Sequence, residues 1–147
     1  MRAKEYLLQI KKLDTLIDNK LTEVEHWKAI ASGIGSRSEG ERVQSTGNKQ
    51  TMAEAVARYM DMEAEINADI DRLVDIRQEV ISTIEKLDLI EYDILHKIYV
   101  QGLQLWEVAD IYKKSYSWIT TIHGRALANL QKILNEREHD NETSKET

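Results

Sequence analysis

Apolar residues recur mostly at spacings of three and four between Arg2 and Ala31, with charged residues between them. The positions on this stripe are Leu7, Ile10, Leu13, Ile17, Leu21, Val24 and Ala31. Such a spacing places the apolar side chains on one face of an α-helix and leaves the charged side chains on the other faces. The pattern therefore predicts one long amphipathic helix at the start of the chain.

A second stripe of the same kind follows Thr51. Thr51 and Glu54 fit a capping box, in which a threonine hydroxyl and a glutamate carboxylate satisfy free amides at a helix start. The stripe itself consists of Val56, Tyr59, Ile66, Ile70, Leu73, Val80, Ile84 and Leu87. Together the stripes predict an antiparallel, coiled-coil-like helical hairpin over residues 1–86. A two-helix hairpin buries little surface, so we expect it to form a homo-oligomer, a dimer in the simplest case.

Residues 32–50 separate the two stripes and differ from them in composition. They contain four of the six glycines, Gly33, Gly35, Gly40 and Gly47, together with several serines. These residues favour irregular backbone, so a glycine- and serine-rich loop is predicted between the two helices. The stretch Glu41–Ser45 within it indicates no chemistry.

The C-terminal third, residues 87–135, has a shorter pattern that is typical of three helices joined by tight turns. Asp88 and Glu91 fit a second capping box, which predicts a first helix over Asp88–Gln101. Gly102 follows this helix and suits the left-handed conformation that ends many helices. The three-helix element is thus expected to begin directly after the hairpin.

The second of these helices is predicted over Leu105–Tyr112, where the small Ala109 lets a neighbouring helix approach closely. A turn at Lys113–Lys114 follows, and Ser115 is a suitable N-cap for a third helix over Tyr116–Leu134. The positions of the third helix expected to face inward are Ile119, Ile122, Ala126, Leu127, Leu130 and Ile133.

Composition supports an all-α fold, because the chain has no proline and few glycines to interrupt long helices. Residues 136–147 contain no apolar side chain and are predicted to be a disordered tail. The chain has no cysteine, which excludes disulfides and thiolate metal sites. Neither a signal peptide nor an apolar run long enough to span a bilayer is recognised, so we expect a cytoplasmic protein.

Charge is distributed unevenly along the sequence. The formal net charge is −6, and residues 52–93 alone hold 12 acidic and 4 basic residues. Residues 111–135 hold no acidic residue and four basic ones, Lys113, Lys114, Arg125 and Lys132. A locally positive segment can dock on phosphate even in an acidic protein, because the local potential matters more than the total charge.

Several runs in this third of the chain resemble region 4 of the sigma-70 family, a helix-turn-helix. Residues 87–95, Leu-Asp-Leu-Ile-Glu-Tyr-Asp-Ile-Leu, are similar to its opening helix, and residues 99–109, Tyr-Val-Gln-Gly-Leu-Gln-Leu-Trp-Glu-Val-Ala, to its tyrosine, glycine and Glu-Ile-Ala pattern. Its recognition-helix spacing is matched by Ser115, Ile119, Ile122, Ala126, Leu127 and Leu130. The resemblance implies binding to double-stranded DNA, with bacterial RNA polymerase as a further partner.

Over its full length the chain also resembles small phage and prophage proteins of Gram-positive bacteria, the DUF1492 group, and more loosely phage regulators of the ArpU type. The shared runs are Ala-Lys-Glu-Tyr-Leu at 3–7, Glu-Arg-Val-Gln-Ser at 41–45, Asp-Ile-Asp-Arg-Leu at 69–73 and His-Gly-Arg-Ala-Leu at 123–127. These resemblances imply a sequence-specific phage transcription regulator, with activation of late genes as one form of that role.

The third helix is expected to lie in the major groove with its N-terminal residues on base edges and its lysines on phosphates. The predicted DNA-binding residues are Lys113, Lys114, Ser115, Tyr116, Ser117, Trp118, Thr120, Thr121, His123 and Arg125. Three features depart from the sigma pattern. A lysine occupies the turn position where glycine is common, Gln104 replaces the usual Ser or Thr cap, and the outward residues are uncharged. The target sequence therefore does not carry over.

Two other functions fit the same sequence features as DNA-binding regulation. A packaging or structural adaptor resembling a small terminase would use the hairpin to form a DNA-binding oligomer, and a third reading is a coiled-coil interaction module. Trp118 is equally compatible with facing DNA and with packing against the first long helices. Trp106 is expected to face solvent, where it could be an interface residue. No nucleophile, base and orienting group occur together, so no enzyme is predicted.

Bound metal ions and cofactors are not expected either. The four histidines, His26, His96, His123 and His139, lack the spacing of metal ligands. Gly33-Ile-Gly35 lacks the Lys-Ser/Thr of a phosphate-binding loop. The acidic residues between positions 61 and 75 are read as the solvated face of a helix.

Overall fold

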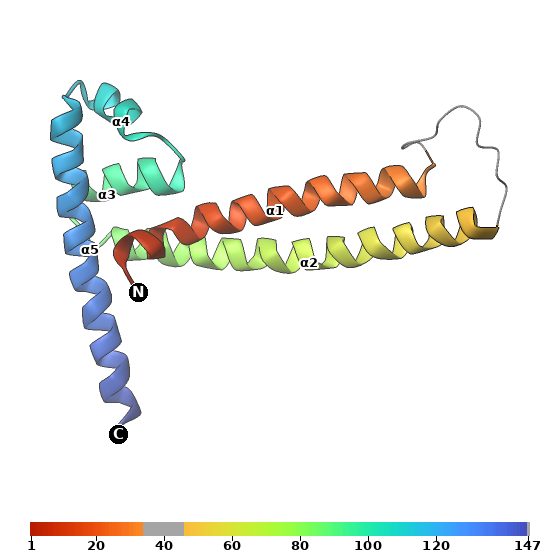
Figure 1. The fold of residues 1–147 in the computed structure, drawn as a ribbon. Coiled ribbons are helices and arrows are strands. Elements are labelled where there is room, and N and C mark those ends of the chain that lie inside the picture. Colours follow the sequence, from red (N-terminus) through yellow and green to blue (C-terminus); the bar gives the residue numbers. More distant parts are fainter. Residues whose placement is uncertain (34–45, 147) are drawn as a thin grey trace. The chain divides into compact units, whose positions relative to one another are not determined.

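A computed structural model of the chain is all-helical, as composition and periodicity predict (Figure 1). It describes residues 1–33 and 46–146, with side chains at all of these positions except 46–49. The elements are α1 (Ala3–Ala31), α2 (Thr46–Ile84), α3 (Leu89–Leu95), a single π-helical turn η1 (His96–Val100), α4 (Leu105–Tyr112) and α5 (Tyr116–Lys145). No strand occurs among the described residues. None of the helices described combines the length and apolarity needed to cross a membrane.

The chain divides into two compact units. One unit comprises Leu13–Leu73, and the other comprises Met1–Lys12 together with Val74–Thr147. Helices α1 and α2 each contribute residues to both units. The division therefore does not fall at residue 86, where the sequence pattern changes. We refer to Leu13–Leu73 as the two-helix unit and to the rest as the C-terminal unit.

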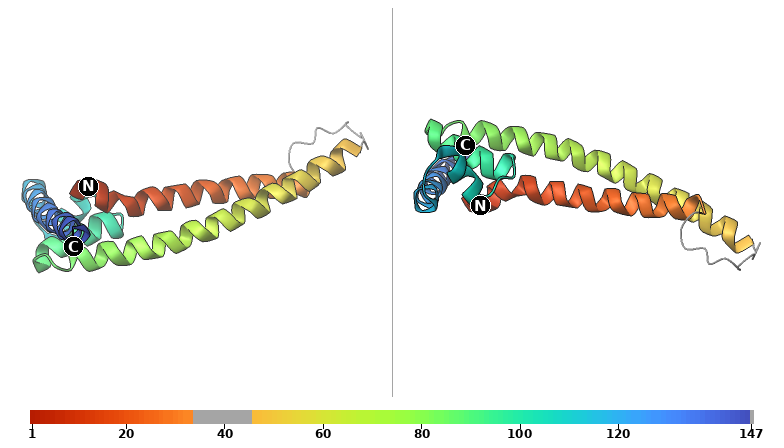
Figure 2. Two further views of the ribbon diagram at one scale, coloured as in Figure 1. Left: turned by 90° about the horizontal axis from the view of Figure 1, so that it is seen from below. Right: turned by 90° about the horizontal axis from the view of Figure 1, so that it is seen from above.

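In the two-helix unit, segments of α1 and α2 lie side by side and run in opposite directions (Figure 2). Their contact face buries apolar residues of both helices, including Ile17 and Val24 of α1 and Ala55 and Ile66 of α2. Ile17, Val24 and Ile66 belong to the periodic stripes, whereas Ala55 is buried in place of its neighbour Val56, which is half-buried. Burial of apolar surface explains why the helices pair along this face.

A polar contact interrupts this apolar seam. Asp69 is only 7% exposed, and its Oδ2 accepts a hydrogen bond from Lys20 Nζ at 2.7 Å. The hydrogen bond to Asp69, with the negative charges of Asp69 and Glu65, outweighs burial and raises the pKa of Lys20. A slip of either helix would separate Lys20 from this buried carboxylate and leave it only the longer contact with Arg72, at 3.7 Å. The pair therefore fixes the register of the two helices, as polar residues do in coiled coils.

The C-terminal unit has a core with two parts. Leu7, Val80 and Ile84 are fully buried, and the Tyr6 hydroxyl donates to Thr83 Oγ1 at 2.9 Å. The second part lies between α3, α4 and α5, and it consists of Ile94, Val108, Ala109, Ile119 and Ile122. The predicted inward positions of the last helix are thus largely buried, although Leu127 and Ile133 are only half-buried and Leu134 is buried instead.

The end of the α3–η1 segment departs from a regular helix. Gln101 N donates to the His96 carbonyl at 2.9 Å, the i to i−5 bond of a π-turn. Gly102 then adopts φ +80°, and Leu103 N bonds back to the Lys97 carbonyl at 2.9 Å. Gly102 is therefore the left-handed cap that the sequence predicts, because glycine has no Cβ to oppose a positive φ.

One predicted helix start and one predicted capping box are wrong. Helix α2 begins at Thr46, so Thr51 lies inside the helix and does not cap it. The residues before Thr51 include no proline, and nothing in them forces a later start. Asp88 does occupy the N-cap position of α3, but its side chain makes no capping bond. Glu91, the other half of that predicted box, turns inward and is 1% exposed. The rest of the predicted loop, residues 34–45, lies outside the described residues.

The predicted disordered tail is also wrong over most of its length, because α5 continues to Lys145. Arg137 Nη1 pairs with Glu79 Oε1 of α2 at 3.1 Å, and the Thr143 hydroxyl donates to the His139 carbonyl at 2.8 Å. The prediction of disorder for residues 136–147 rests on their lack of apolar side chains. An exposed helix needs no apolar residues where neighbouring charges and helix-permissive side chains support it.

Glu91 makes the most buried charged contact of the C-terminal unit. Its Oε1 accepts from Arg125 Nε at 2.9 Å and from Asn129 Nδ2 at 2.8 Å. We expect Glu91→Ala to lower the free energy of unfolding by about 2 to 3 kcal/mol, because two donors on α5 lose their buried acceptor. Urea denaturation followed by circular dichroism measures this loss. The exposed Glu85→Ala is the control, and an equal effect of the two variants would contradict the assignment.

Candidate nucleic-acid interface

Helix α4 forms the base of the candidate interface. Its bounds, Leu105–Tyr112, match the predicted ones. The Gln104 backbone N–H donates to Glu107 Oε1 at 3.3 Å, so the glutamate supplies a capping contact although the usual Ser or Thr cap is missing. Val108 and Ala109 are buried against the core. Trp106 lies on the outer side and is 64% exposed, as its spacing predicts.

The turn after α4 is a Schellman motif built on a lysine. Lys114 N donates to the Ala109 carbonyl at 2.9 Å and Lys113 N to the Asp110 carbonyl at 3.1 Å. Both bonds satisfy carbonyls that the end of a helix leaves free. The motif requires a left-handed residue, and Lys113 supplies it with φ 54° and ψ 44°. Among the described residues, Lys113 is the one non-glycine residue with a positive φ.

Helix α5 begins directly after this turn. Ser115 is its N-cap, and the Ser115 Oγ accepts from the Trp118 backbone N–H at 3.1 Å. This is the cap that the sequence predicts. Three residues, Lys113, Lys114 and Ser115, therefore connect the end of α4 to the start of α5. So short a connection brings the exposed side chains of the turn next to those of the first turns of α5.

A set of polar and aromatic contacts holds this turn on the core. The Tyr112 hydroxyl donates to Asp93 of α3, and Lys97 Nζ pairs with the same carboxylate. Burial, together with the hydrogen bond to Asp93, raises the pKa of Tyr112 to about 12. Burial works to raise the pKa of Asp93, but the hydrogen bonds from Lys97 and Tyr112 outweigh it and lower that pKa. The turn is thus tied to α3 by a charged, hydrogen-bonded group.

Trp118 belongs to the packing side of α5. Its ring lies 5.6 Å from the Tyr112 ring between centroids, and it packs on the α3–α4–α5 core. Lys114 Nζ sits 5.9 Å from the centre of the Trp118 ring. Trp118 is therefore half-buried, with its ring next to Tyr112 and Lys114, and the DNA-binding role expected for it stays a prediction.

The outer face of α5 carries small side chains. Ser117, Thr121, Gly124 and Ala128 recur at spacings of three and four, and all four residues are exposed. A Cβ added at Gly124 would meet nothing within 4 Å. Tyr116 is a large exposed residue at the start of this helix, with 58% of its surface accessible. A face of this kind lets another surface approach close to the helix backbone.

The threonine hydroxyls on this face are already oriented. Thr120 Oγ1 and Thr121 Oγ1 each donate to the Ser117 carbonyl at 2.9 Å. A hydroxyl that donates inward keeps its lone pairs available as acceptors, and its methyl group remains an apolar contact. Thr120 is half-buried, whereas Thr121 is exposed. Thr121 is consequently the better placed of the two for an outside contact.

Two residues of the predicted interface turn elsewhere. His123 Nε2 is 2.8 Å from the Tyr99 hydroxyl, and the two rings stack with centroids 5.8 Å apart. Arg125 directs its Nε to the buried Glu91. These contacts join α5 to η1 and α3, and the DNA-binding role expected for His123 and Arg125 stays a prediction. Sequence could not indicate these contacts, because Tyr99 and Glu91 are distant in the chain.

The residues that remain together and exposed form what we name the α5 face. It consists of Lys113, Lys114, Ser115, Tyr116, Ser117, Thr121 and Gly124. Gly124 was missing from the prediction, although the helical spacing from Ser117 and Thr121 could have found it. No acidic residue occurs between positions 111 and 135. In the described part of the chain, no three His, Asp or Glu side chains gather in a way that could hold a metal ion.

Comparisons with known proteins add no relative. No protein-family model matches the chain, and no curated protein or solved structure matches it significantly. The resemblances to sigma region 4 and to the phage proteins therefore rest on the motifs of the sequence alone.

The left-handed Lys113 makes a prediction about stability. A side chain with a Cβ is strained at φ 54°, whereas glycine is not. We expect Lys113→Gly to raise the free energy of unfolding by about 0.5 to 1 kcal/mol. Lys114→Gly is the matched control and should be destabilised, because Lys114 has no positive φ to relieve. The variant gains backbone freedom in the unfolded chain and loses the contact with Trp118. Thermal denaturation of both variants tests this, and a destabilised Lys113→Gly would show that the side chain holds the turn.

The buried histidine predicts a pH dependence. Burial lowers the pKa of His123, and the charge of Lys4 adds to this effect. The folded chain then binds fewer protons than the unfolded chain, so stability is complete above the ordinary histidine pKa of about 6.5 and falls as the pH drops below it. Urea titrations between pH 7.5 and pH 5.5 should show this decrease. His123→Gln should reduce this decrease without abolishing it, because burial also lowers the pKa of His96. An unchanged slope in that variant would contradict the prediction.

Proposed function

We propose that this chain is a sequence-specific DNA-binding protein, a transcription regulator of the phage type, in which α4 and α5 act as a helix-turn-helix. The observation that carries the proposal is the α5 face. It combines an exposed helix start, two flanking lysines and a complete absence of acidic residues between positions 111 and 135.

In this proposal, α5 is the recognition helix and enters the major groove with its first two turns. The small side chains at Ser117, Thr121 and Gly124 let the helix backbone come close to the base edges. Ser117 and Thr121 offer hydroxyl contacts, and the Thr121 methyl group suits a thymine methyl. Tyr116, at the rim of the face, reaches either a base or the sugar-phosphate backbone.

Electrostatics would supply most of the affinity. Lys113 and Lys114 flank the N-terminus of α5, where the helix dipole also favours an anion. Lys114 is held near this end by its contact with Trp118. Phosphates bound here would fix the position of the helix in the groove without reading sequence. Arg125 would contribute less to phosphate binding, because Glu91 already pairs with its guanidinium.

The alternatives differ in assembly and in partners. Regulation, including activation of late genes through contact with RNA polymerase, is the reading that the resemblance to sigma region 4 favours. A dimer formed by the predicted hairpin of α1 and α2 would present two recognition helices to a two-fold symmetric site. A packaging adaptor would instead form a ring-sized oligomer, which light scattering distinguishes from a dimer.

The test of DNA binding is a charge reversal in the turn. We expect Lys113→Glu/Lys114→Glu to lower affinity for a promoter duplex by about ten- to a hundredfold at low salt, because both cations release counterions from phosphate. The slope of log K against log salt should decrease by about two for the same reason. Fluorescence anisotropy with a labelled duplex, recorded at several salt concentrations, measures both quantities.

Lys11→Glu/Lys12→Glu is the matched control. It reverses two adjacent exposed lysines on α1, outside the α5 face. The control variant should retain nearly the affinity and the salt slope of the unaltered chain, and circular dichroism should show both variants folded. Equal losses of affinity in the two variants would show that net charge alone causes the effect. No salt-dependent binding by the unaltered chain at low ionic strength would refute the proposal.

A further inference from the structure

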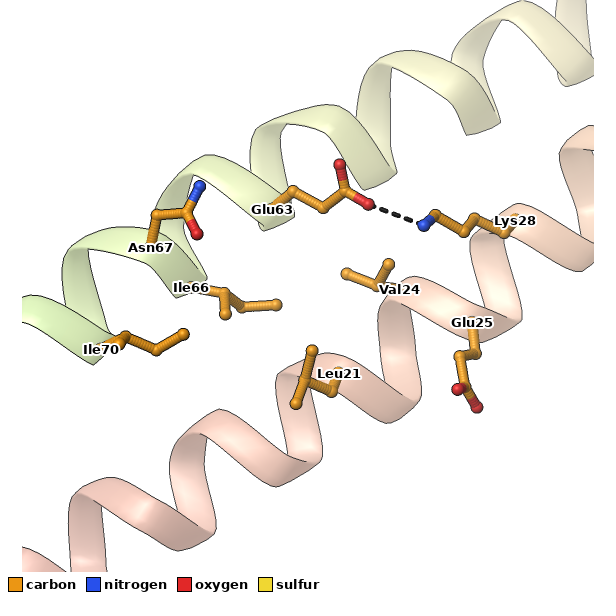
Figure 3. A pocket seen from close by; sticks show the side chains of 8 residues that line it. All are labelled: Leu21, Val24, Glu25, Lys28, Glu63, Ile66, Asn67 and Ile70. Carbon is orange, nitrogen blue, oxygen red and sulfur yellow. Dashed lines mark ion pairs between the residues drawn. The ribbon is translucent and has the colours of Figure 1, made fainter. Parts of the chain in front are cut away.

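A groove opens between α1 and α2 within the two-helix unit (Figure 3). Its volume is about 370 Å³, and it is open to solvent along one side. Val24 and Ile66 form its floor and are each 4% exposed. Leu21 and Ile70 form its two apolar edges, and they are 46% and 41% exposed. The seam between the helices therefore leaves part of its apolar surface uncovered on this side.

The rim of the groove along α1 is acidic. Glu25 lines the groove, while Asp14 and Asp18 precede Leu21 by seven and three residues, which places them on the same helix face. Asp14, Asp18 and Glu25 are exposed. Neither Asp14 nor Asp18 forms an ion pair in the part of the chain that the structure describes.

The two lysines of this α1 segment do not balance the rim. Lys28 Nζ pairs with Glu63 Oε1 at 2.8 Å, and Lys20 Nζ pairs with Asp69 Oδ2 at 2.7 Å. Both cations are thus engaged by carboxylates of α2. The groove therefore presents an apolar floor beside exposed carboxylates that no lysine of this segment neutralises.

We propose that this groove binds a basic amphipathic helix of a partner protein. Apolar side chains at spacings of three and four on that helix would lie between Leu21 and Ile70. Lysines or arginines flanking them would face Asp14, Asp18 and Glu25. The rim from Asp14 to Lys28 spans about 21 Å of helix, enough for a partner segment of about fourteen residues.

The charge of the rim decides between this occupant and a second copy of the chain. Two copies joined through the same face would bring the rim carboxylates of each toward those of the other. Like charges in an interface oppose association, whereas a basic helix neutralises the rim. The inference is independent of DNA binding, because every residue that it uses lies within Leu13–Leu73.

A designed peptide tests the proposal on the full chain. The probe is a fluorescein-labelled sixteen-residue helix with leucines at i, i+3, i+4 and i+7 spacing and lysines elsewhere. We expect saturable binding by fluorescence anisotropy, weakened about tenfold by Leu21→Ser/Ile70→Ser. Asp14→Asn/Asp18→Asn should weaken it about fivefold and reduce its salt dependence. The same peptide with glutamates in place of lysines should not bind.

Two controls make the outcome decisive. Leu16→Ser alters a leucine of similar exposure, 42%, that does not line the groove, and it should leave binding unchanged. Methyl NMR of the unaltered chain should show peptide-dependent shifts at Leu21 and Ile70, which avoids reliance on the stability of any variant. Equal losses in all variants, or no shifts at these methyls, would overturn the proposal. A dimer that Leu21→Ser/Ile70→Ser converts to a monomer in sedimentation would assign the groove to a second copy and overturn it as well.

Discussion

The carboxylate of Glu91 is the contact on which the geometry of the C-terminal unit depends. It is almost fully removed from solvent, and α5 supplies its donors through Arg125 and Asn129. A buried carboxylate must keep its donors, so α5 has little freedom to rotate about its own axis. This rotation decides which side chains of α5 face outward. A contact in the interior of the unit therefore sets the composition of the α5 face, although neither of its donors forms part of that face.

The sequence correctly predicts the features that depend on local signals. Gly102, the bounds of α4 and the N-cap at Ser115 each depend on residues within one or two turns of the chain. The sequence does not predict contacts between residues that are far apart in the chain. Glu91 fits a capping box by spacing, but burial against α5 gives it stronger partners. The helix over residues 136–145 has the same explanation in part, because the Glu79 carboxylate that pairs with Arg137 comes from α2.

The residues of the candidate interface also fall into two groups: those that local sequence signals predict and those that depend on contacts distant in the chain. The exposed residues at the start of α5 follow from helical spacing and capping, so periodicity alone could identify most of them. Trp118, His123 and Arg125 have the chemistry of DNA contacts, and only the folded chain shows that Tyr112, Tyr99 and Glu91 engage them. Residue type indicates what a side chain can do, whereas its neighbours in space decide which of those contacts it makes.

The π-helical turn at His96–Val100 has a consequence for how this chain can vary. A π-turn accommodates one residue more than a regular α-helix with the same start and end. Removing one residue here would therefore let the segment close as a regular α-helix between the same ends, whereas adding one, at about 100° of rotation per residue, would turn Tyr99 and Val100 off the core. Both side chains are buried, and Tyr99 also holds His123 of α5. A single-residue deletion in this segment should therefore be tolerated better than a single-residue insertion, because the phase of the helix, more than the identity of its residues, connects η1 to α5.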